Sequence, residues 1–283
     1  MPEETSNPAT LQSVQAWLNW GADQLRHVAD RPLLEAQILL AHACGRDRLW
    51  LITHPQSPLA AGTYPSAILR RADHEPLEYI TTQASFYSRL FKVAAGVLIP
   101  RPETELLIDH ALTAIENLPT PRIAEIGTGS GVIAVMIALL RPDATVVATD
   151  INPKAIALAS ENARLYSVKD RIEFVRTSLL DGIDKPFDLL ISNPPYIAAD
   201  ALLQPHVLQE PHEALFGGEV GDELLREIID LACQRGITTL ACESGYDQRE
   251  RLGAYLAAKS ISRVDFYQDY AGLQRGFVAR IDD

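Results

Sequence analysis

The chain of 283 residues carries 25 Lys and Arg against 37 Asp and Glu, a formal charge of −12, and 47% of its residues are hydrophobic. This composition excludes extensive disorder, and the length allows one large domain or two ordinary ones. The acidic balance argues against a protein that grips duplex DNA, because such binding needs clustered Lys and Arg to displace counterions from the phosphates.

Membrane insertion, secretion and metal binding have little support in the sequence. The longest apolar run, Val132 to Leu140, is far shorter than the roughly 20 residues that span a bilayer. The first ten residues are polar and acidic, unlike a secretory signal. The 3 cysteines show no CxxC spacing. We therefore expect a cytoplasmic protein with no membrane contact and no metal site.

The N-terminal part of the chain has helical periodicity and little that resembles a strand. Apolar residues such as Leu18 and Leu25 recur at helical spacing. A second helical stretch opens at Pro32, a favourable first position, and stops at Gly45. These patterns predict an all-helical domain over residues 1–75.

Residues 76–100 differ in character. They are rich in β-branched and aromatic residues, which predicts a β-hairpin that links two domains. A helix then opens at Pro102, with Glu103 and Glu105 in its first turn, where the helix dipole favours anions.

From Arg122 onward, short apolar strands alternate with helical stretches. This alternation predicts an α/β fold, a parallel Rossmann-like sheet covered by helices on both faces. The last two strands follow one another without a helix, so the final strand is expected to be antiparallel. The seven predicted strands are RIAEI, ATVVATD, RIEFV, FDLLIS, ITTLACE, SRVDFY and RGFVARI.

A glycine loop joins the first of these strands to a helix. It reads Gly127, Thr128, Gly129, Ser130 and Gly131. Glycines at this position let the backbone turn tightly and let a ligand approach the N–H groups of a helix start. The spacing G-x-G-x-G differs from the dinucleotide fingerprint G-x-G-x-x-G and resembles motif I of the S-adenosylmethionine-dependent methyltransferases. The alternative is a tight strand–helix turn without a ligand.

The second strand ends at Asp150. An acidic residue at that strand tip, about 20 residues beyond a glycine loop, can accept hydrogen bonds from both ribose hydroxyls. A helix cap is the alternative role, and Asn152 is the better candidate for it. The loop and the acid together favour a nucleoside ligand.

The fourth strand runs into Asn193, Pro194, Pro195 and Tyr196. Two prolines and an aromatic residue make a rigid, exposed loop at the edge where α/β proteins bind ligands. A chance turn of this composition is the alternative. The motif marks methyltransferases that alkylate a planar nitrogen, either the exocyclic amine of a base or the amide of glutamine.

The chemistry of such a nitrogen explains these residue types. An amide lone pair is delocalised and weakly nucleophilic. The side-chain oxygen of Asn193 and the carbonyl of Pro194 can hold the two amide hydrogens and stabilise the positive charge that develops on nitrogen. Tyr196 offers a flat wall, and alignment of nitrogen and methyl supplies much of the acceleration. We assign Asn193, Pro194 and Tyr196 as catalytic and add Pro195 to the substrate site.

Several further stretches accompany these motifs. They are Phe91-Lys92-Val93, LIPRPETE from Leu98 to Glu105, Glu210-Pro211 with Gly217-Gly218, GYDQ from Gly245 to Gln248, and Asp269 with Ala271-Gly272 and Arg275. With them the chain resembles, over nearly its full length, the release-factor glutamine N5-methyltransferases, the PrmC/HemK family.

This resemblance implies the organisation, the cofactor and the acceptor. The cofactor is S-adenosyl-L-methionine, and the acceptor is the glutamine of a Gly-Gly-Gln loop in peptide chain release factors. The implied segments are a helical substrate-recognition domain (1–75), a β-hairpin linker (76–100) and a seven-stranded methyltransferase domain (101–283). The implied cofactor residues are Gly127 to Gly131, Asp150, Ser178, Leu179 and Asn193, and the implied substrate residues are Asn193 to Tyr196.

The chain departs from the family pattern after the third strand. Family members usually carry an Asp there, followed by an aromatic residue or Leu, to contact adenine. This chain reads Thr177, Ser178 and Leu179, so a hydroxyl stands in the Asp position and Leu179 is expected to pack on the ring. Arg101 has two interpretations: a salt bridge to Glu103 or Glu105, or a loop packed over the cofactor, which we favour.

Three other functions are compatible with parts of the sequence. A ribosomal-protein glutamine methyltransferase would share all of the motifs. An N6-adenine DNA methyltransferase would share the Asn-Pro-Pro-Tyr chemistry, but the net charge and the IPRPETE stretch argue against it. A non-catalytic nucleoside-binding module is the third, and the intact Asn-Pro-Pro-Tyr motif argues against it because such a module would not need it.

Overall fold

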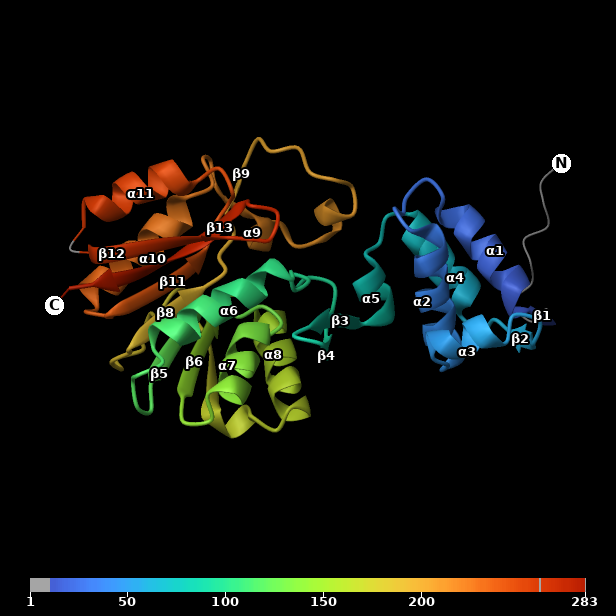
Figure 1. Cartoon of the computed structure of the whole chain (residues 1–283), viewed down its shortest axis with the longest axis horizontal. Coiled ribbons are helices and arrows are strands. Elements are labelled where there is room, and N and C mark those ends of the chain that lie inside the picture. Colours follow the sequence, from blue (N-terminus) through green and yellow to red (C-terminus); the bar gives the residue numbers. More distant parts are fainter. Residues whose placement is uncertain (1–10, 260, 283) are drawn as a thin grey trace. The chain divides into compact units, whose positions relative to one another are not determined.

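The computed structural model describes residues 11–259 and 261–282, with the side chain of Leu11 left out. The first ten residues, where no secretory signal is expected, lie outside this part. The chain forms two compact units (Figure 1). One contains the chain up to Thr82 together with Gln204–Gln209, and the other contains Gln83–Leu203 and Glu210–Asp283.

The first unit is a small helical bundle around Trp17 and Tyr64, both fully buried. Ser13 caps its first helix by accepting the backbone N–H of Ala16 at 3.2 Å. The structure adds a two-stranded antiparallel pair to the helices predicted here. The elements are β1 (Leu11–Ser13), α1 (Val14–Leu25), α2 (Pro32–Cys44), α3 (Arg48–Thr53), β2 (Pro58–Ala60), α4 (Tyr64–Ala72) and α5 (Leu77–Thr81).

The second unit holds a seven-stranded sheet in the order β12-β13-β11-β8-β5-β6-β7. The predicted seven-stranded α/β fold is confirmed, and so is its antiparallel last strand, since β13 runs antiparallel to both of its neighbours. The sheet strands are β5 (Arg122–Ile126), β6 (Thr145–Asp150), β7 (Ile172–Arg176), β8 (Leu189–Ser192), β11 (Thr239–Glu243), β12 (Ile261–Gln268) and β13 (Gln274–Ile281).

Helices and smaller elements surround this sheet. Pro102, predicted to open a helix, precedes one directly, and Asn152 caps another by accepting the N–H of Lys154 at 2.9 Å. The helices are α6 (Glu103–Ala114), α7 (Val132–Leu140), α8 (Pro153–Leu165), α9 (His212–Leu215), α10 (Glu223–Gln234) and α11 (Arg249–Ala257). The remaining elements are the hairpin β3 (Gln83–Phe86) and β4 (Arg89–Lys92), the parallel pair β9 (Ile197–Ala198) and β10 (Phe216–Gly218), and the 3-10 turns η1 (Lys169–Arg171) and η2 (Val207–Gln209).

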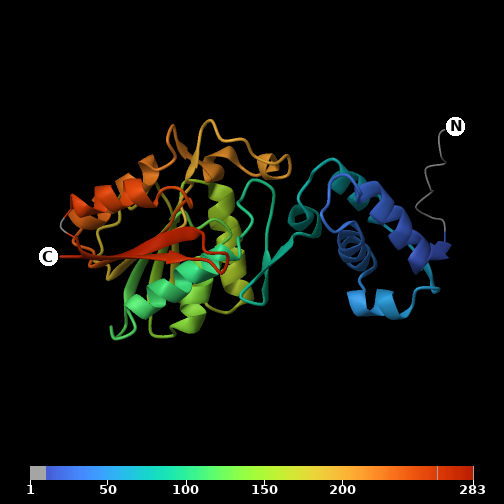
Figure 2. The same ribbon diagram turned by 45° about the horizontal axis from the view of Figure 1, so that its top comes forward.

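Each strand contributes to two cores because successive side chains point to opposite faces of a sheet. In β8, Leu189 and Ile191 pack with α6 and α7, whereas Leu190 packs with α10 and α11. Figures 1 and 2 show these two groups of helices, green and orange, on opposite sides of the sheet. Burial on both faces explains why the central strands read as continuous apolar runs.

The register brings the ends of four parallel strands to one edge of the sheet. Ile126 pairs with Thr149 and with Ser192, and Ser192 pairs with Cys242. The glycine loop, Asp150 and the Asn-Pro-Pro-Tyr loop follow directly, at the edge where open α/β sheets bind ligands. Within the described residues, no helix is long and apolar enough to cross a membrane.

Candidate active site

A cavity of about 210 Å³ lies at this carboxyl edge. Its lining combines the first four residues of the glycine loop, Asp150, Thr177 to Leu179, Asn193 and Pro195. Arg101, two residues before α6, and Thr104, in its first turn, also line it. Most of the predicted site residues thus lie around one cavity.

Two glycines of the loop serve different purposes. Gly127 has φ +74° and has open space where a Cβ would be. Gly131 has φ +82°, and its added Cβ would lie 2.7 Å from Cβ of Ala159 on α8. Gly131 is not among the lining residues of the cavity. Its observed role is therefore to let α8 approach the loop closely.

Glu125 lies directly behind the glycine loop and was not assigned from the sequence. It is fully buried, and burial raises its pKa to about 8. Its Oε2 accepts a hydrogen bond from the Thr128 hydroxyl at 3.0 Å, while its Oε1 has no partner within the part of the chain that the structure describes. The sequence signal was an acidic residue among the apolar residues Ile123, Ala124 and Ile126 of its strand.

Asp150 binds the backbone on both sides of its strand tip. Oδ2 accepts the N–H of Gly129 at 2.9 Å, and Oδ1 accepts the N–H of Asn152 at 2.8 Å. Its pKa is raised, mainly by burial, with a contribution from the negative charge of Glu213, which also lines the cavity. Two lone pairs of the carboxylate stay available, enough for a ribose diol.

The turn after β7 forms the next wall. Thr177, Ser178 and Leu179 all line the cavity. The backbone of Leu179 has φ +47°, a conformation that residues other than glycine rarely adopt. The Thr149 hydroxyl donates to the Leu179 carbonyl at 2.7 Å and helps to hold this strained turn. Such strain persists where the surrounding structure enforces it, often beside a ligand.

The Asn-Pro-Pro-Tyr loop divides between the cavity and the core. Asn193 and Pro195 line the cavity, whereas Pro194 is buried outside its lining. Tyr196 is partly buried, its hydroxyl donates to Oε1 of Glu243 at 3.1 Å, and burial raises its pKa above the usual range. Its carbonyl accepts from Nε2 of Gln248 at 2.9 Å.

The Asn193 side-chain amide is held by two buried residues, Thr104 and Glu243. Its Nδ2 donates to Oγ1 of Thr104 at 3.0 Å, and that hydroxyl donates to Oε2 of Glu243 at 2.7 Å. Sequence reasoning assigned no role to Thr104 or Glu243. The available signal for Glu243 was an acidic residue that ends a buried strand at the same edge as Asn193.

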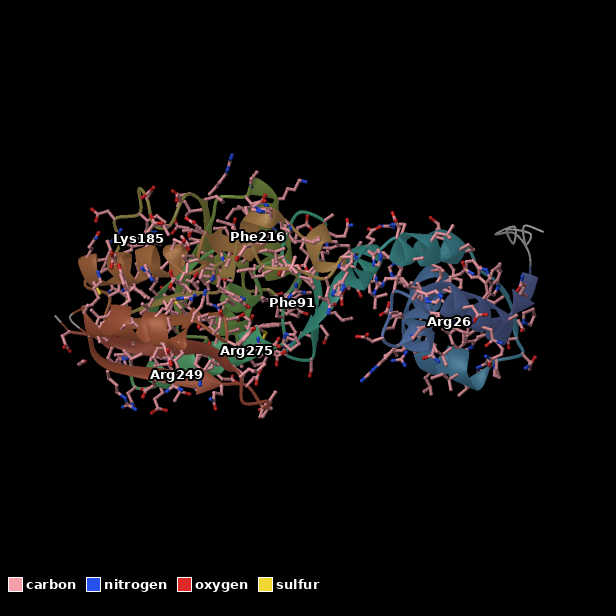
Figure 3. The ribbon with its side chains drawn as sticks, turned by 90° about the horizontal axis from the view of Figure 1, so that it is seen from above. Arg26, Phe91, Lys185, Phe216, Arg249 and Arg275 are labelled. Carbon is pink, nitrogen blue, oxygen red and sulfur yellow. The ribbon has the colours of Figure 1, made fainter. Side chains whose placement is uncertain are left out.

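Arg101 pairs with neither of the two acids proposed from the sequence. Its guanidinium binds Glu210, a buried residue that also accepts the N–H of Ile99 at 2.9 Å. Glu103 instead pairs with Arg275, labelled in Figure 3, at 3.2 Å between Oε1 and Nη2. The alternative of a loop packed beside the cavity agrees with the position of Arg101 in its lining.

These residues fit S-adenosyl-L-methionine by their chemistry. Asp150 suits the ribose, and the strained turn suits the adenine. The described residues contain no group of three His, Cys, Asp or Glu side chains that could hold a metal ion.

Two family models match the chain. The Methyltransferase small domain matches residues 102–220, and the PrmC N-terminal domain matches residues 16–81. The PrmC N-terminal domain match lies within the first compact unit. The Methyltransferase small domain match lies within the second, apart from the short segment Gln204–Gln209.

Curated relatives cover nearly the whole chain. The "Release factor glutamine methyltransferase" of Buchnera aphidicola subsp. Baizongia pistaciae is 30% identical over 272 residues, 93% of this chain and 97% of that protein. The protein of the same name from Moorella thermoacetica is 38% identical over 259 residues, 88% of this chain and 92% of that protein.

Solved structures share the fold. The hMettl16 catalytic domain, in complex with MAT2A 3′UTR hairpin 6, has a TM-score of 0.58 at 16% identity, covering 68% of this chain and 76% of that chain. The human methyltransferase 10 domain containing protein has a TM-score of 0.53 at 19% identity, with coverages of 68% and 88%. At these identities, the likeness concerns the fold alone.

Proposed function

The chain belongs to the release factor glutamine methyltransferase family, and we propose that it transfers a methyl group from S-adenosyl-L-methionine to the side-chain amide nitrogen (N5) of a glutamine in a peptide chain release factor. This agrees with the family resemblance inferred from the sequence. We also propose a cytoplasmic location, because release factors work on ribosomes.

The orientation of Asn193 is the observation that carries the proposal. Its Nδ2 donates to Thr104, so its Oδ1 is the atom of this cavity-lining amide that can accept a hydrogen bond from a ligand. An amide nitrogen that is to be methylated offers two hydrogens, and an acceptor is the group that can bind them. We propose that Asn193 Oδ1 accepts one hydrogen and the Pro194 carbonyl the other.

The proposed cofactor roles follow the lining of the cavity. Gly127, Thr128, Gly129 and Ser130 shape the floor, and Asp150 receives the ribose hydroxyls. Ser178 and Leu179 receive the adenine. When bound, the cofactor supplies an electrophilic sulfonium methyl group, and the role of the chain is to align the acceptor nitrogen with it and to exclude water.

The acceptor-side residues act by orientation and charge. As the nitrogen is alkylated, positive charge develops on it, and the oxygens of Asn193 and Pro194 stabilise that charge because they are already oriented. Pro195 lines the cavity, and we propose that it and the adjacent Tyr196 form a wall beside the planar amide. The methyl–sulfur bond would break as the methyl–nitrogen bond forms, so S-adenosyl-L-homocysteine would be the leaving group. The excess proton on nitrogen would pass to solvent, which restores a neutral amide.

The acceptor is proposed to be the glutamine of the Gly-Gly-Gln loop. Flanking glycines allow the backbone to come close to the cavity. We propose that the helical domain of residues 1–75 recognises the rest of the factor, residues 76–100 link the domains, and residues 101–283 carry the chemistry. Binding energy from such a remote surface can position the reacting group.

A parallel acceptor assay tests the proposal. Labelled methyl transfer from S-adenosyl-L-methionine is measured with purified release factors, ribosomal proteins and DNA under the same conditions. We expect transfer to release factors and none to DNA. Preferential transfer to a ribosomal protein, or to DNA, would replace the proposed acceptor.

A further inference from the structure

One buried carboxylate connects the side chains of Asn193 and Tyr196, the two ends of the Asn-Pro-Pro-Tyr loop. Glu243, the last residue of β11, is 1% exposed. It accepts a hydrogen bond from Thr104 on Oε2 at 2.7 Å and from Tyr196 on Oε1 at 3.1 Å. Thr104, which is 2% exposed, accepts in turn from Nδ2 of Asn193 at 3.0 Å. The four side chains form a continuous chain of hydrogen bonds.

The direction of this chain follows from the number of hydrogens. A hydroxyl group has a single hydrogen, and an ionised carboxylate has none. Because Thr104 donates its hydrogen to Glu243, its oxygen can only accept a bond from Asn193. Only the NH₂ group of Asn193 can donate that bond, so its amide oxygen is the end left free.

We propose that Glu243 and Thr104 are positioning residues that hold the Asn193 amide with its oxygen available to the acceptor nitrogen, while Glu243 also holds the Tyr196 ring. The identity of the acceptor rests on the proposed function. The orientation of Asn193 does not, because it depends only on contacts within the chain.

The state of Glu243 depends on the elements packed around it. Burial raises its pKa to about 7, the bonds from Thr104 and Tyr196 lower it, and the remaining charges act in both directions. The other titratable and charged groups that interact with Glu243 or its partner Tyr196 are Glu103 on α6, Arg275 on β13, Tyr267 on β12, and Arg101.

Protonation of Glu243 would allow the hydrogen bonds between Glu243, Thr104 and Asn193 to run in the opposite direction. A protonated carboxyl can donate to Thr104, and the Thr104 hydroxyl is then free to donate to Asn193. That arrangement favours the reversed amide, with the NH₂ group at the free end. Turnover is therefore expected to fall as the pH decreases through about 7, and the fall should depend on Thr104.

A double-mutant cycle tests whether Thr104 acts through Asn193. Thr104→Val removes the hydroxyl at constant shape and should lower kcat for the release factor by about 10- to 100-fold, as loss of alignment does. Thr104→Ser restores the hydroxyl and should recover most of that loss. In an Asn193→Ala background, Thr104→Val should cause no further loss, because the side chain it orients is gone.

We call the hydrogen-bonded series Glu243–Thr104–Asn193 the relay. Two results of this cycle would contradict its proposed role. One is wild-type kcat in Thr104→Val, and the other is a double variant whose loss equals the product of the two single losses. Unfolding midpoints of all variants are measured alongside, since a merely structural role would lower stability in both backgrounds and leave the losses multiplicative. Failure of the wild-type protein to methylate release factor would contradict the proposed function alone.

A second measurement judges the relay without any substrate. The ¹H–¹⁵N signals of the Asn193 side chain, assigned by their loss in Asn193→Ala, are followed through a pH titration of the full chain. We expect a shift with a midpoint near the pKa of Glu243, about 7, which disappears in Glu243→Gln. Signals that do not titrate, or that titrate unchanged in Glu243→Gln, would contradict the relay whatever the acceptor is.

Discussion

Oδ2 of Asp150 accepts a hydrogen bond from the backbone N–H of Gly129 at 2.9 Å. This contact joins the tip of β6 to the glycine loop that follows β5. The residue proposed to bind the ribose therefore also holds the loop on which the cofactor would rest. Loss of the carboxylate should affect the cofactor site in two ways, by removing a ligand group and by releasing the loop.

Replacement of Asp150 by Ala should strongly weaken the binding of S-adenosyl-L-methionine. Each charge-assisted hydrogen bond to the ribose contributes roughly 1.5–3 kcal/mol, and the loop anchor is lost as well. Titration calorimetry measures the change. Glu161→Gln, at a half-exposed ion pair with Lys92, serves as the control. Equal affinity in Asp150→Ala and the wild type would remove the ribose assignment.

The hydroxyl in the adenine position gives a gain-of-affinity test. Ser178 lines the cavity beside the strained Leu179. A carboxylate accepts a stronger hydrogen bond from an exocyclic amine than a hydroxyl does, so Ser178→Asp should tighten cofactor binding. Ser178→Ala is the matched comparison and should bind no more tightly than the wild type. Weaker binding in Ser178→Asp would place Ser178 away from the adenine amine.

Two glycines of the same loop should respond differently to Ala. Gly131→Ala places a Cβ 2.7 Å from Cβ and 2.8 Å from Cα of Ala159 in a left-handed conformation. It should lower the free energy of unfolding by about 2–5 kcal/mol, the sum of crowding and backbone strain. Gly127→Ala meets open space and adds only strain, about 1–2 kcal/mol.

Cofactor affinity should separate the two glycine variants as well. Gly127 lines the cavity, so its Cβ should weaken binding of S-adenosyl-L-methionine even though the fold tolerates it. Urea unfolding gives the stabilities and calorimetry the affinities. Equal losses of stability in both variants would contradict the packing role of Gly131.

The buried Glu125 predicts a pH dependence of stability. Its pKa rises from the usual 4.5 to about 8 because burial disfavours the charged form. Between these values the folded state binds more protons than the unfolded state, so this group makes the free energy of unfolding fall as the pH rises, by up to about 1.4 kcal/mol per pH unit. The fall should level off above about 8.

Glu125→Gln removes this contribution while keeping the shape of the side chain. Urea unfolding of both proteins across this pH window gives the difference in slope, which cancels the contributions of other groups. We expect the variant to gain stability relative to the wild type as the pH rises. Parallel stability profiles would show that Glu125 is ionised throughout.

Local patterns were sufficient to predict many of the residues that line the cavity. The glycine loop, Asp150 and Asn193 each follow a strand whose apolar run is visible in the sequence, and the carboxyl ends of parallel strands meet at one edge. The alternation of apolar strands with helical stretches, which is also visible in the sequence, predicted the seven-stranded sheet. These features depend on neighbours in the chain and on general topology.

The supporting contacts could not be predicted because they join distant segments. Thr104 and Glu243 are 139 positions apart in the sequence, and Arg101 and Glu210 are 109 apart. No local period or spacing relates such pairs, so the sequence offered Arg101 only its nearest acids, Glu103 and Glu105, as ion-pair partners and gave no sign of Glu210. The β1–β2 pair was missed because each strand has only 3 residues, too few to establish a period of two.

The most direct test of the central claim is the site of methylation in intact release factor. The factor is incubated with the full chain and S-adenosyl-L-methionine, digested, and sequenced by tandem mass spectrometry, beside a variant factor whose Gly-Gly-Gln glutamine is replaced. We predict a single methyl group on the side-chain nitrogen of that glutamine and no methylation of the variant factor. A methyl group on another residue, or methylation that persists in the variant factor, would contradict the account.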